Sequence, residues 1–289
     1  MSGGADSLTL LVLAVAAGCE VTAVHVDHGL RPGSAAEAEV VADAARRLGA
    51  GFRAERVELV EGPNLEARAR AARHGVLGPD ALLGHTADDQ AETIVLNLMR
   101  GAGVTGLAGI RADERHPILD LRRHETEALC AALGLDPVRD PSNLDPRHRR
   151  NRVRAEVLPL LDEVAGRDVV AVLARQAEHL REVDDLLVAA ADGLDPTDAA
   201  ALARAPAPVA RVAVRRWLGG ADPQGHPPDA ATVARVLAVA RLGARATDVG
   251  GGRRVSRSRG RLRLESPRAE PDAGPGSGRG PVAPPPSRS

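Results

Sequence analysis

The sequence predicts an α/β protein with a doubly wound, mostly parallel sheet, followed by a helical domain. The glycine pair Gly3-Gly4 leads directly into the apolar run Leu8–Ala17, a pattern typical of a tight turn that opens a helix. Short apolar or β-branched runs then alternate with helical patterns, as in repeated strand–helix–strand units. Beyond residue 193 the helical patterns continue with hardly any strand, which indicates a second, smaller domain.

The first candidate site is the segment Ser2–Ser7. Its glycines let the backbone come close to a ligand, and the helix that follows offers free N–H groups and the positive end of its dipole. This combination suits a phosphate, and Asp6 beside a phosphate points to a bridging divalent cation. The lysine of a G-x-x-x-x-G-K-S/T loop is missing. For these six residues alone, an ordinary glycine turn that caps a helix is the alternative.

The next elements follow in strand–helix alternation. Strands are predicted at 21–26, 52–59 and 80–84, and helices at 34–48 and 64–76. The helix at 34–48 opens with a capping box, Ser34 and Glu37, and stops at Gly49. Asp27 follows the first strand at its carboxyl end, where open α/β sheets bind their ligands.

A second polar segment, His85–Thr93, follows the third predicted strand. Asp89 and Glu92 are three residues apart near the start of a helix that continues to Arg100, so they share one helix face. Acidic capping of the helix dipole is the simple interpretation. The functional one is a site for Mg²⁺ or a cationic substrate with His85 above it, and the position beyond a strand favours it.

Residues 101–106 match the dinucleotide pattern G-x-G-x-x-G, but this match is rejected. A dinucleotide site needs a strand before the glycines and a helix after them, and here a helix comes first. A tight helix exit is the better interpretation.

The second half of the chain is mostly helical. A helix is predicted at 124–133, a turn at 140–143, and helices from 155 to 192 with a break at Gly166. The basic run Arg147–Arg154 is either a solvated helix start or a contact for a phosphate backbone, and we favour the second. Further helices (198–204, 207–218 and 229–242) and a hairpin-like end (247–265) form the small domain. The composition after residue 266 is that of a disordered tail.

Composition excludes several classes of protein. The formal net charge is -1, so any nucleic-acid site must be a local patch, and all 38 basic residues are arginine. Cys19 and Cys130 lie far apart, which argues against a disulfide framework or a zinc knuckle. No basic stretch precedes the first apolar run, and that run is too short to span a bilayer. The expectation is a cytoplasmic protein without a membrane partner.

Taken together, these segments resemble the tRNA(Ile)-lysidine synthases, a family of N-type ATP pyrophosphatases (PP-loop superfamily). The matching pieces come in the family's order over about the first 160 residues: Ser2–Ser7, His25–Arg31, Asn64–Arg73, His85–Thr93 with Arg100-Gly101, and Asp140–Asn143 followed by Arg150–Arg154 and Leu158-Pro159. The resemblance implies an adenine nucleotide alpha-hydrolase-like fold. It implies a catalytic domain with a helical extension at 1–192, a tRNA-binding domain at 193–265 and a tail at 266–289.

The resemblance also implies a reaction. ATP, with Mg²⁺, would adenylate C2–O of the wobble cytidine in a tRNA(Ile) with a CAU anticodon, and free L-lysine would then displace AMP to form lysidine. A homodimer is left open. The implied site residues fall into four groups: ATP-binding Ser2, Gly3, Gly4, Ala5, Asp6, Ser7 and Asp27; catalytic His85, Asp89, Arg70 and Arg73; tRNA-binding or substrate-binding Arg100, Arg150, Arg152 and Arg154; and Mg²⁺-binding Asp6 and Asp88.

The sequence departs from the family pattern in two places. Family members carry a hydrophobic strand before the loop, whereas this sequence begins at the loop, so we expect poor stability or weak ATP binding from the chain as written. His74 stands where the family usually has tyrosine. Three rivals remain: a 2-thiocytidine synthetase, which usually relies on reactive cysteines such as C-x-x-C; a small-molecule ligase like NAD or GMP synthetase, which would not need a basic second domain; and a nucleotide-binding regulatory module without turnover.

Overall fold

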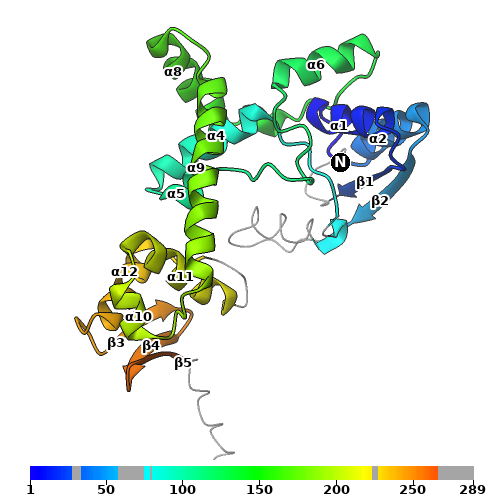
Figure 1. The fold of residues 1–289 in the computed structure, drawn as a ribbon. Coiled ribbons are helices and arrows are strands. Elements are labelled where there is room, and N and C mark those ends of the chain that lie inside the picture. The colour runs from blue at the N-terminus through cyan, green and yellow to red at the C-terminus, as the bar shows by residue number, and fades with distance from the viewer. Residues whose placement is uncertain (28–33, 58–74, 79, 223–226, 266–289) are drawn as a thin grey trace, which may run out of the picture. The chain divides into compact units, whose positions relative to one another are not determined.

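A computed structural model describes residues 1–27, 34–57, 75–78, 80–222 and 227–265 (Figure 1). The chain divides into two compact units, Met1–Asp185 and Leu186–Ser289, and each is described by itself. The division falls within one long helix, a few residues before the boundary at 192 that the sequence predicts. No helix in the described ranges is long and apolar enough to cross a membrane.

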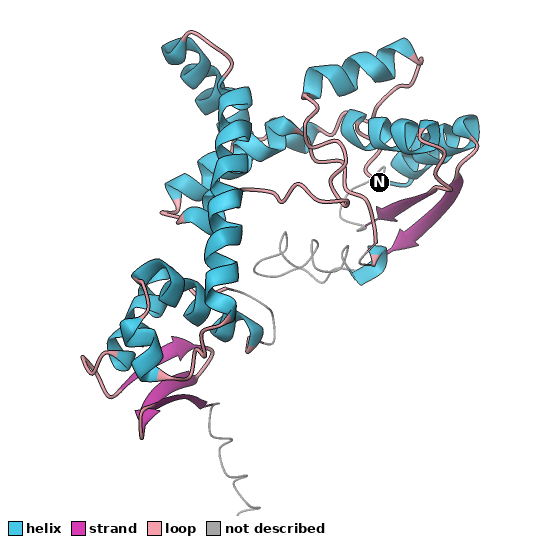
Figure 2. Ribbon diagram, viewed as in Figure 1, coloured by secondary structure: helices cyan, strands magenta, loops and turns pink. Residues whose placement is uncertain are grey.

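The first unit opens with the predicted α/β arrangement. Strands β1 (Thr22–Asp27) and β2 (Gly51–Arg56) pair in parallel and are connected through helix α2 (Ser34–Leu48), as Figure 2 shows. Helix α1 (Ala5–Ala16) precedes β1 and packs against α6 (Arg123–Ala132). The core between these elements is built from small and branched side chains: Leu8, Leu11, Ala23, Val41, Ala44, Ala45, Cys130 and Leu135.

The third predicted strand, at 80–84, is wrong. The backbone there is irregular and pairs with a distant loop, since the Leu83 N–H donates to the Arg115 carbonyl at 2.7 Å. Arg115 also reaches back to the Ala81 carbonyl through its side chain. The apolar residues that indicated a strand therefore lie in a loop, where Leu82 is exposed. Most of the predicted helix at 64–76 lies outside the described residues, although 75–77 are helical.

The rest of the first unit is helical. Its elements are α4 (Ala87–Met99), the short α5 (Val104–Leu107), the 3-10 turn η1 (Pro141–Leu144), α7 (Arg149–Arg152), the π-helical turn η2 (Val153–Val157), α8 (Leu158–Ala165) and α9 (Val169–Asp192). Ala91, Val95, Val153, Leu158 and Val170 form a second core. Gly166 ends α8 in the left-handed conformation, at the predicted break. The glycines at 101–106 follow α4, which agrees with a helix exit and not with a dinucleotide site.

The described residues of the second unit combine the end of α9 and three further helices with a small sheet. Helices α10 (Ala199–Arg204), α11 (Ala207–Gly220) and α12 (Ala230–Ala240) pack with strands β3 (Ala246–Gly250), β4 (Arg253–Ser258) and β5 (Arg261–Glu265) around one apolar core. The strands are antiparallel in the order β3-β4-β5, so the predicted hairpin-like end is a three-stranded sheet. The predicted tail at 266–289 lies outside the described residues.

Candidate active site

The loop at the amino end is shaped by Gly3. Its φ of +73° lies in the left-handed region, which side chains disfavour. The Gly3 carbonyl accepts a hydrogen bond from the Val138 N–H at 3.0 Å, and a Cβ on Gly3 would stand 2.8 Å from a Val138 methyl group. Ser7 closes the turn, because its hydroxyl donates to the Gly4 carbonyl at 2.9 Å. The loop is therefore held in one conformation by the chain around it.

The start of α1 offers backbone donors. Gly4 is the residue before the first helical turn and has no side chain to cap it. The N–H groups of Ala5, Asp6 and Ser7 belong to that first turn, where an α-helix provides no acceptor of its own. Together with the helix dipole, these N–H groups form a local site suited to an anion such as pyrophosphate.

Replacing Gly3 by alanine is expected to weaken ATP binding strongly. The change forces a side chain into the left-handed region, at a cost of about 1–2 kcal/mol, and drives it into Val138. The loop must then move away from the position in which its N–H groups converge. Gly18→Ala is the matched control, since Gly18 has a φ of +79° with nothing within 4 Å of an added Cβ. Calorimetric titration with ATP should separate the two variants, and equal affinities would contradict the role of the loop.

The second polar segment lies directly against this loop. A Cβ on Gly84 would stand 3.0 Å from the Asp6 carbonyl oxygen and 3.3 Å from the Ser7 Cα, so the backbones at 84 and 6–7 are in contact. His85 follows Gly84 and is half-buried, with its ring 5.2 Å from that of His116. The glycine loop and the His85 segment are therefore neighbours in the structure.

One arginine joins the two parts of this site. Arg123, at the start of α6, places its guanidinium 3.2 Å from an Asp89 carboxylate oxygen, 3.2 Å from Glu92 and 3.7 Å from Asp6. Asp6 comes from the loop helix, whereas Asp89 and Glu92 come from α4. The Thr126 hydroxyl, one turn along α6, donates to Asp6 at 2.6 Å. Helix α6 therefore ties the loop helix to α4 through its first turn.

Asp89 also caps the helix on which it stands. The Thr86 N–H donates to one Asp89 carboxylate oxygen at 3.0 Å, and the Thr86 hydroxyl lies 3.2 Å from the same oxygen. The other oxygen faces Arg123 and, at 3.4 Å, Arg150. The capping role that the sequence offered is therefore confirmed for this carboxylate, and the site for Mg²⁺ or a cationic substrate stays a prediction.

Glu92 is fully buried and is neutralised by two arginines from α7 and η2. Arg150 donates to it at 2.6 Å, and Arg154 donates at 2.6 Å and 3.2 Å. Such bidentate and charge-assisted bonds compensate for the loss of water around a buried carboxylate. Arg150 and Arg154, which the sequence assigns to tRNA binding, are directed into the protein here. Their role toward tRNA stays a prediction.

Asp88 completes the ionic cluster. It accepts from the Arg123 backbone N–H at 2.7 Å and from the Arg122 guanidinium at 3.2 Å and 3.3 Å, and Arg122 also pairs with Asp168. Four carboxylates and four guanidinium groups thus meet around the start of α4: Asp6, Asp88, Asp89 and Glu92 with Arg122, Arg123, Arg150 and Arg154.

Comparison with known proteins agrees with this geometry. Residues 1–161 match the family model of the PP-loop domain. A tRNA(Ile)-lysidine synthase from Nocardia farcinica is 42% identical over 286 residues, covering 91% of this chain and 90% of its own. Another from Mycolicibacterium paratuberculosis is 48% identical over 241 residues, covering 76% and 74%. The chain belongs to the tRNA(Ile)-lysidine synthase family.

A solved structure supports the fold of this family member. A U34-tRNA thiolase from Methanococcus maripaludis superposes with a TM-score of 0.50 at 19% identity, over 63% of this chain and 71% of its own. The likeness is one of fold, and the adenine nucleotide alpha-hydrolase-like class that the sequence predicts is confirmed.

Burial and charge shift the site carboxyls of this synthase-family chain in opposite directions. Burial raises the pKa of Asp6, although the Thr126 hydroxyl and Arg123 oppose it. Burial also acts to raise the pKa of Glu92, but Arg154 and Arg150 outweigh it, so that pKa is lowered. The pKa of Asp88 is lowered in the same way, against burial, by Arg122 and the Arg123 backbone. Of these three carboxyls, Asp6 is thus the one whose charged form is destabilised by the protein.

These shifts predict how stability depends on pH. Because its pKa is lowered on folding, Glu92 stabilises the protein above pH 4.5, the ordinary pKa of a glutamate. This stabilisation is lost as the pH falls from 4.5 through the folded-state pKa. Asp6 has the opposite sign, because its raised pKa removes stability as the pH rises above 3.8. Melting curves between pH 7 and pH 3 should therefore show a loss below about pH 4.5. Glu92→Gln, less stable at neutral pH, should flatten that loss; an unchanged slope would contradict it.

The remaining predicted residues are dispersed. Asp27 ends β1, and Ser2 lies in the loop, where its hydroxyl is 3.4 Å from that of Ser7. Arg100 is exposed at the end of α4, and Arg152 is exposed and paired with Glu156. Arg70 and Arg73 lie outside the described residues. Within the described ranges, no group of three or more histidine, cysteine, aspartate or glutamate side chains is arranged to hold a metal ion.

Two of the residues that organise the site were missed by sequence reasoning. Arg122 and Arg123 open α6, and the sequence interpretation began that helix one residue later without a role for either. A signal was present, because paired arginines at a helix start oppose the helix dipole and need acidic partners. The carboxylates that satisfy them are Asp88 and Asp89, which the sequence did single out.

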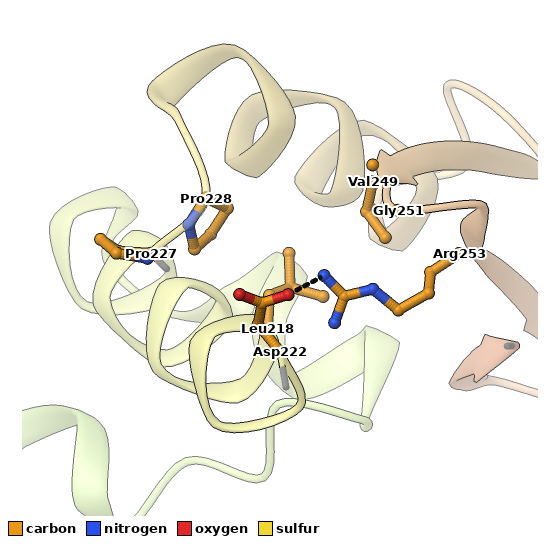
Figure 3. Close-up of a pocket in the computed structure, with 8 residues that line it drawn as sticks. Leu218, Asp222, Pro227, Pro228, Val249, Gly251 and Arg253 are labelled. Atoms are coloured by element: carbon orange, nitrogen blue, oxygen red, sulfur yellow. Dashed lines mark hydrogen bonds and ion pairs between the residues drawn. The ribbon is translucent and has the colours of Figure 1, made fainter. Parts of the chain in front are cut away.

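The second unit holds a cavity of its own. It measures about 310 Å³ and is lined by Leu218, Asp222, Pro227, Pro228, Val249, Gly250, Gly251 and Arg253 (Figure 3). The Arg253 guanidinium extends across it to the Asp222 carboxylate at 2.8 Å and to the Ala221 carbonyl at 2.9 Å. Because the arginine is paired inside the cavity, its charge is compensated there, and the cavity is not a ready site for an anion.

Proposed function

We propose that this chain joins L-lysine to C2 of the wobble cytidine in tRNA(Ile) with a CAU anticodon, at the expense of ATP. The C2 oxygen attacks the α-phosphorus of ATP, and pyrophosphate leaves. The ε-amine of lysine then attacks C2, the C2–O bond breaks, and AMP leaves with that oxygen. The product is lysidine, with one AMP and one pyrophosphate formed for each lysine joined. The contact between the glycine loop and the His85 segment is the observation that carries the proposal.

The glycine loop serves the first step. Its N–H groups at Ala5, Asp6 and Ser7 would hold the phosphates that leave as pyrophosphate, where negative charge increases as the α-phosphorus is attacked. The loop conformation is fixed before the nucleotide binds, through Gly3 and Val138. Asp27, at the carboxyl end of β1, is in a position typical of nucleotide contacts in α/β sheets.

Asp6 fits a magnesium ion better than Asp88 does. Mg²⁺ usually takes one or two carboxylates and completes its shell with water and substrate phosphates. Asp6 stands in the loop with acceptor capacity left beside one hydroxyl and a guanidinium at 3.7 Å. Both oxygens of Asp88 receive N–H donors from Arg122 and Arg123. Bound Mg²⁺ would spread the charge of the phosphates, and Asp6 is the residue that would hold it.

Asp89 and His85 serve the second step. Asp89 would hold the ammonium group of lysine or accept its proton, and His85 would contact the nucleotide or the cytidine. The arginine pairs around Asp89 and Glu92 fix the position of that carboxylate before lysine binds. Arg70 and Arg73 remain proposed partners of phosphate or of the lysine carboxylate. The cytoplasm is the proposed location, and a homodimer is the proposed alternative to a monomer.

The cysteines favour this reaction over sulfur transfer. The chain has two, and Cys130 is buried in the core beneath α1, where burial raises the pKa of its thiol. Its sulfur lies near the Thr9 hydroxyl and the Ala5 carbonyl, which is a packing environment. A thiol with a raised pKa is a poor nucleophile at neutral pH. Cys19 is exposed, lies far from Cys130 in the sequence and has no second cysteine beside it.

Transfer of labelled lysine tests the proposal. Purified chain, ATP and Mg²⁺ are incubated with ¹⁴C-lysine and a tRNA(Ile) transcript of CAU anticodon, with tRNA(Met) as the control. We expect acid-precipitable label on tRNA(Ile) alone, with AMP and pyrophosphate formed in equal amounts. ATP binding without pyrophosphate release would identify a regulatory module instead. Adenylation of the RNA that accepts sulfide but not lysine would identify a thiolase.

A further inference from the structure

The end of α4 and the helical segment Arg149–Val157 enclose a groove that the cluster around Glu92 does not use. Its floor is apolar and consists of Leu96, Val153 and Val157, which continue into the core between α4 and η2. Met99 forms one wall and is 60% exposed. We call this the α4–η2 groove, and its complete lining is Leu96, Met99, Arg100, Arg149, Arg152, Val153, Glu156 and Val157.

The rim of the groove is positively charged. Three arginines line it, Arg100, Arg149 and Arg152, against one carboxylate, Glu156. Arg152 and Glu156 pair with each other at 2.7 Å, so the positive charges of Arg100 and Arg149 are not balanced by a carboxylate of the groove lining. Among the described residues, no ion pair is formed by Arg100 or Arg149. An apolar floor under uncompensated arginines suits a flat, apolar group attached to an anion.

The π-helical turn forms part of the groove. η2 interrupts the helix between Arg152 and Leu158 and supplies Val153, Glu156 and Val157 to the lining, and such turns are frequent at functional sites. Arg150 and Arg154, four residues apart, both face Glu92, while Arg149 and Arg152 line the groove. The same basic run therefore serves two purposes, one inside the protein and one at its surface.

The size of the groove selects the occupant. Its volume of about 290 Å³ is at the small end for ligand sites and matches a single ring system with its sugar better than a peptide or a helix. Met99 stands ten residues after Asp89 on α4, so the groove lies roughly 15 Å along the helix from the carboxylate proposed to act on lysine. A nucleotide elsewhere in the same RNA loop spans such a distance.

We propose that the α4–η2 groove binds an unstacked base of the RNA substrate, in the same loop as the base that reacts. The base lies on Met99 and the apolar floor, Arg100 and Arg149 contact its flanking phosphates, and the arginine planes take the place of aromatic rings, of which this chain has few. The inference rests on the proposed function, because it takes RNA as the substrate. The proposed base-binding site is formed entirely by residues of the first unit.

A charge substitution with a matched control tests the groove. Met99→Glu adds an anion to the groove wall, and Leu160→Glu makes the same change at a leucine on α8 that is 56% exposed and outside the groove. Fluorescence anisotropy with full-length tRNA(Ile) at fixed salt should give a roughly tenfold weaker Kd for Met99→Glu, with Leu160→Glu like wild type. Arg149→Gln should reduce the salt dependence of tRNA binding by about one phosphate contact.

Abasic RNAs show whether a base is what the groove binds. Transcripts that lack one base at each anticodon-loop position are titrated against wild type and Met99→Glu. We expect one position at which loss of the base weakens RNA binding by the wild-type protein but causes no further loss of affinity in Met99→Glu, as in a double-mutant cycle. Equal effects of every abasic site on both proteins would assign the Met99→Glu effect to charge alone and overturn the proposal. Unchanged tRNA affinity, or a change in oligomeric state by sedimentation instead, would also overturn it.

The groove and the proposed function fail in different ways. Wild-type chain that binds tRNA with base-dependent affinity but transfers no lysine would refute the reaction and retain the groove. Lysine transfer by wild type together with equal affinities for all variants would refute the groove and retain the reaction. Wild-type chain that binds no RNA would refute both.

Discussion

Replacing Arg123 by alanine is expected to lower the free energy of unfolding by about 3–5 kcal/mol, the usual effect of removing one partner from a buried ion pair. Its guanidinium faces Asp89, Glu92 and Asp6, and burial, which lowers its pKa, is outweighed by these three carboxylates, so the pKa is raised. Without it, the carboxylates repel one another at the junction of α1, α4 and α6. The loss should appear in urea titrations and as a large fall in Tm.

Two variants define what Arg123 contributes. Arg46→Ala removes an arginine from an exposed pair with Asp43 and should have little effect on stability, because exposed pairs are screened by water. Arg123→Lys keeps the positive charge, but an ammonium group lacks the planar fork with which arginine contacts three carboxylates. This variant should therefore be more stable than Arg123→Ala and less stable than wild type. Stability of Arg123→Ala equal to that of Arg46→Ala would contradict the account of the ionic cluster.

Changing Asp89 to asparagine is expected to reduce lysine transfer by at least about a hundredfold, the contribution of a positioned acid–base group. The amide oxygen of asparagine can still accept the Thr86 N–H, so the capped start of α4 is kept. What is lost is the negative charge that would hold or deprotonate the lysine ammonium. The variant therefore separates the structural role of the side chain from its chemical role.

The comparison with Asp89→Ala completes this test. The alanine variant should lose transfer as well, and in addition lose the helix cap, with a lower Tm than the asparagine variant. Pyrophosphate release that depends on tRNA should persist in Asp89→Asn, since adenylation precedes attack by lysine. Lysine transfer near the wild-type rate in Asp89→Asn would remove this residue from the mechanism.

Sequence reasoning identified the loop and the acidic pair because their signals are local. Gly3-Gly4 before a helix and Asp89 with Glu92 on one helix face are patterns of neighbouring residues, and the structure connects the two segments through Arg123, which faces Asp6, Asp89 and Glu92. The segment at 80–84 was misjudged because its apolar residues look the same in a strand and in a packed loop. Only the distant carbonyl of Arg115, which Leu83 uses, decides between them.

The arginines show the limit of such reasoning most clearly. Arg150, Arg152 and Arg154 belong to one basic run in the sequence, and the sequence alone predicts a phosphate contact equally well for each of them. Helix geometry separates them, because Arg150 and Arg154 share a face and Arg152 does not: two neutralise Glu92, and the third lines the α4–η2 groove. The partners are 58 and 62 residues away, so no local pattern could assign them. Arg123 was missed for the same reason, since its three carboxylates come from two other helices.

The central claim is that the C2 oxygen of the cytidine is activated by adenylation, and oxygen transfer tests it most directly. A tRNA(Ile) carrying ¹⁸O at C2 of the wobble cytidine is incubated with the chain, unlabelled ATP and lysine, and the AMP is analysed by mass spectrometry. Our account predicts AMP with one ¹⁸O atom for each lysidine formed. Unlabelled AMP, with ¹⁸O retained in the RNA or lost to water, would contradict it.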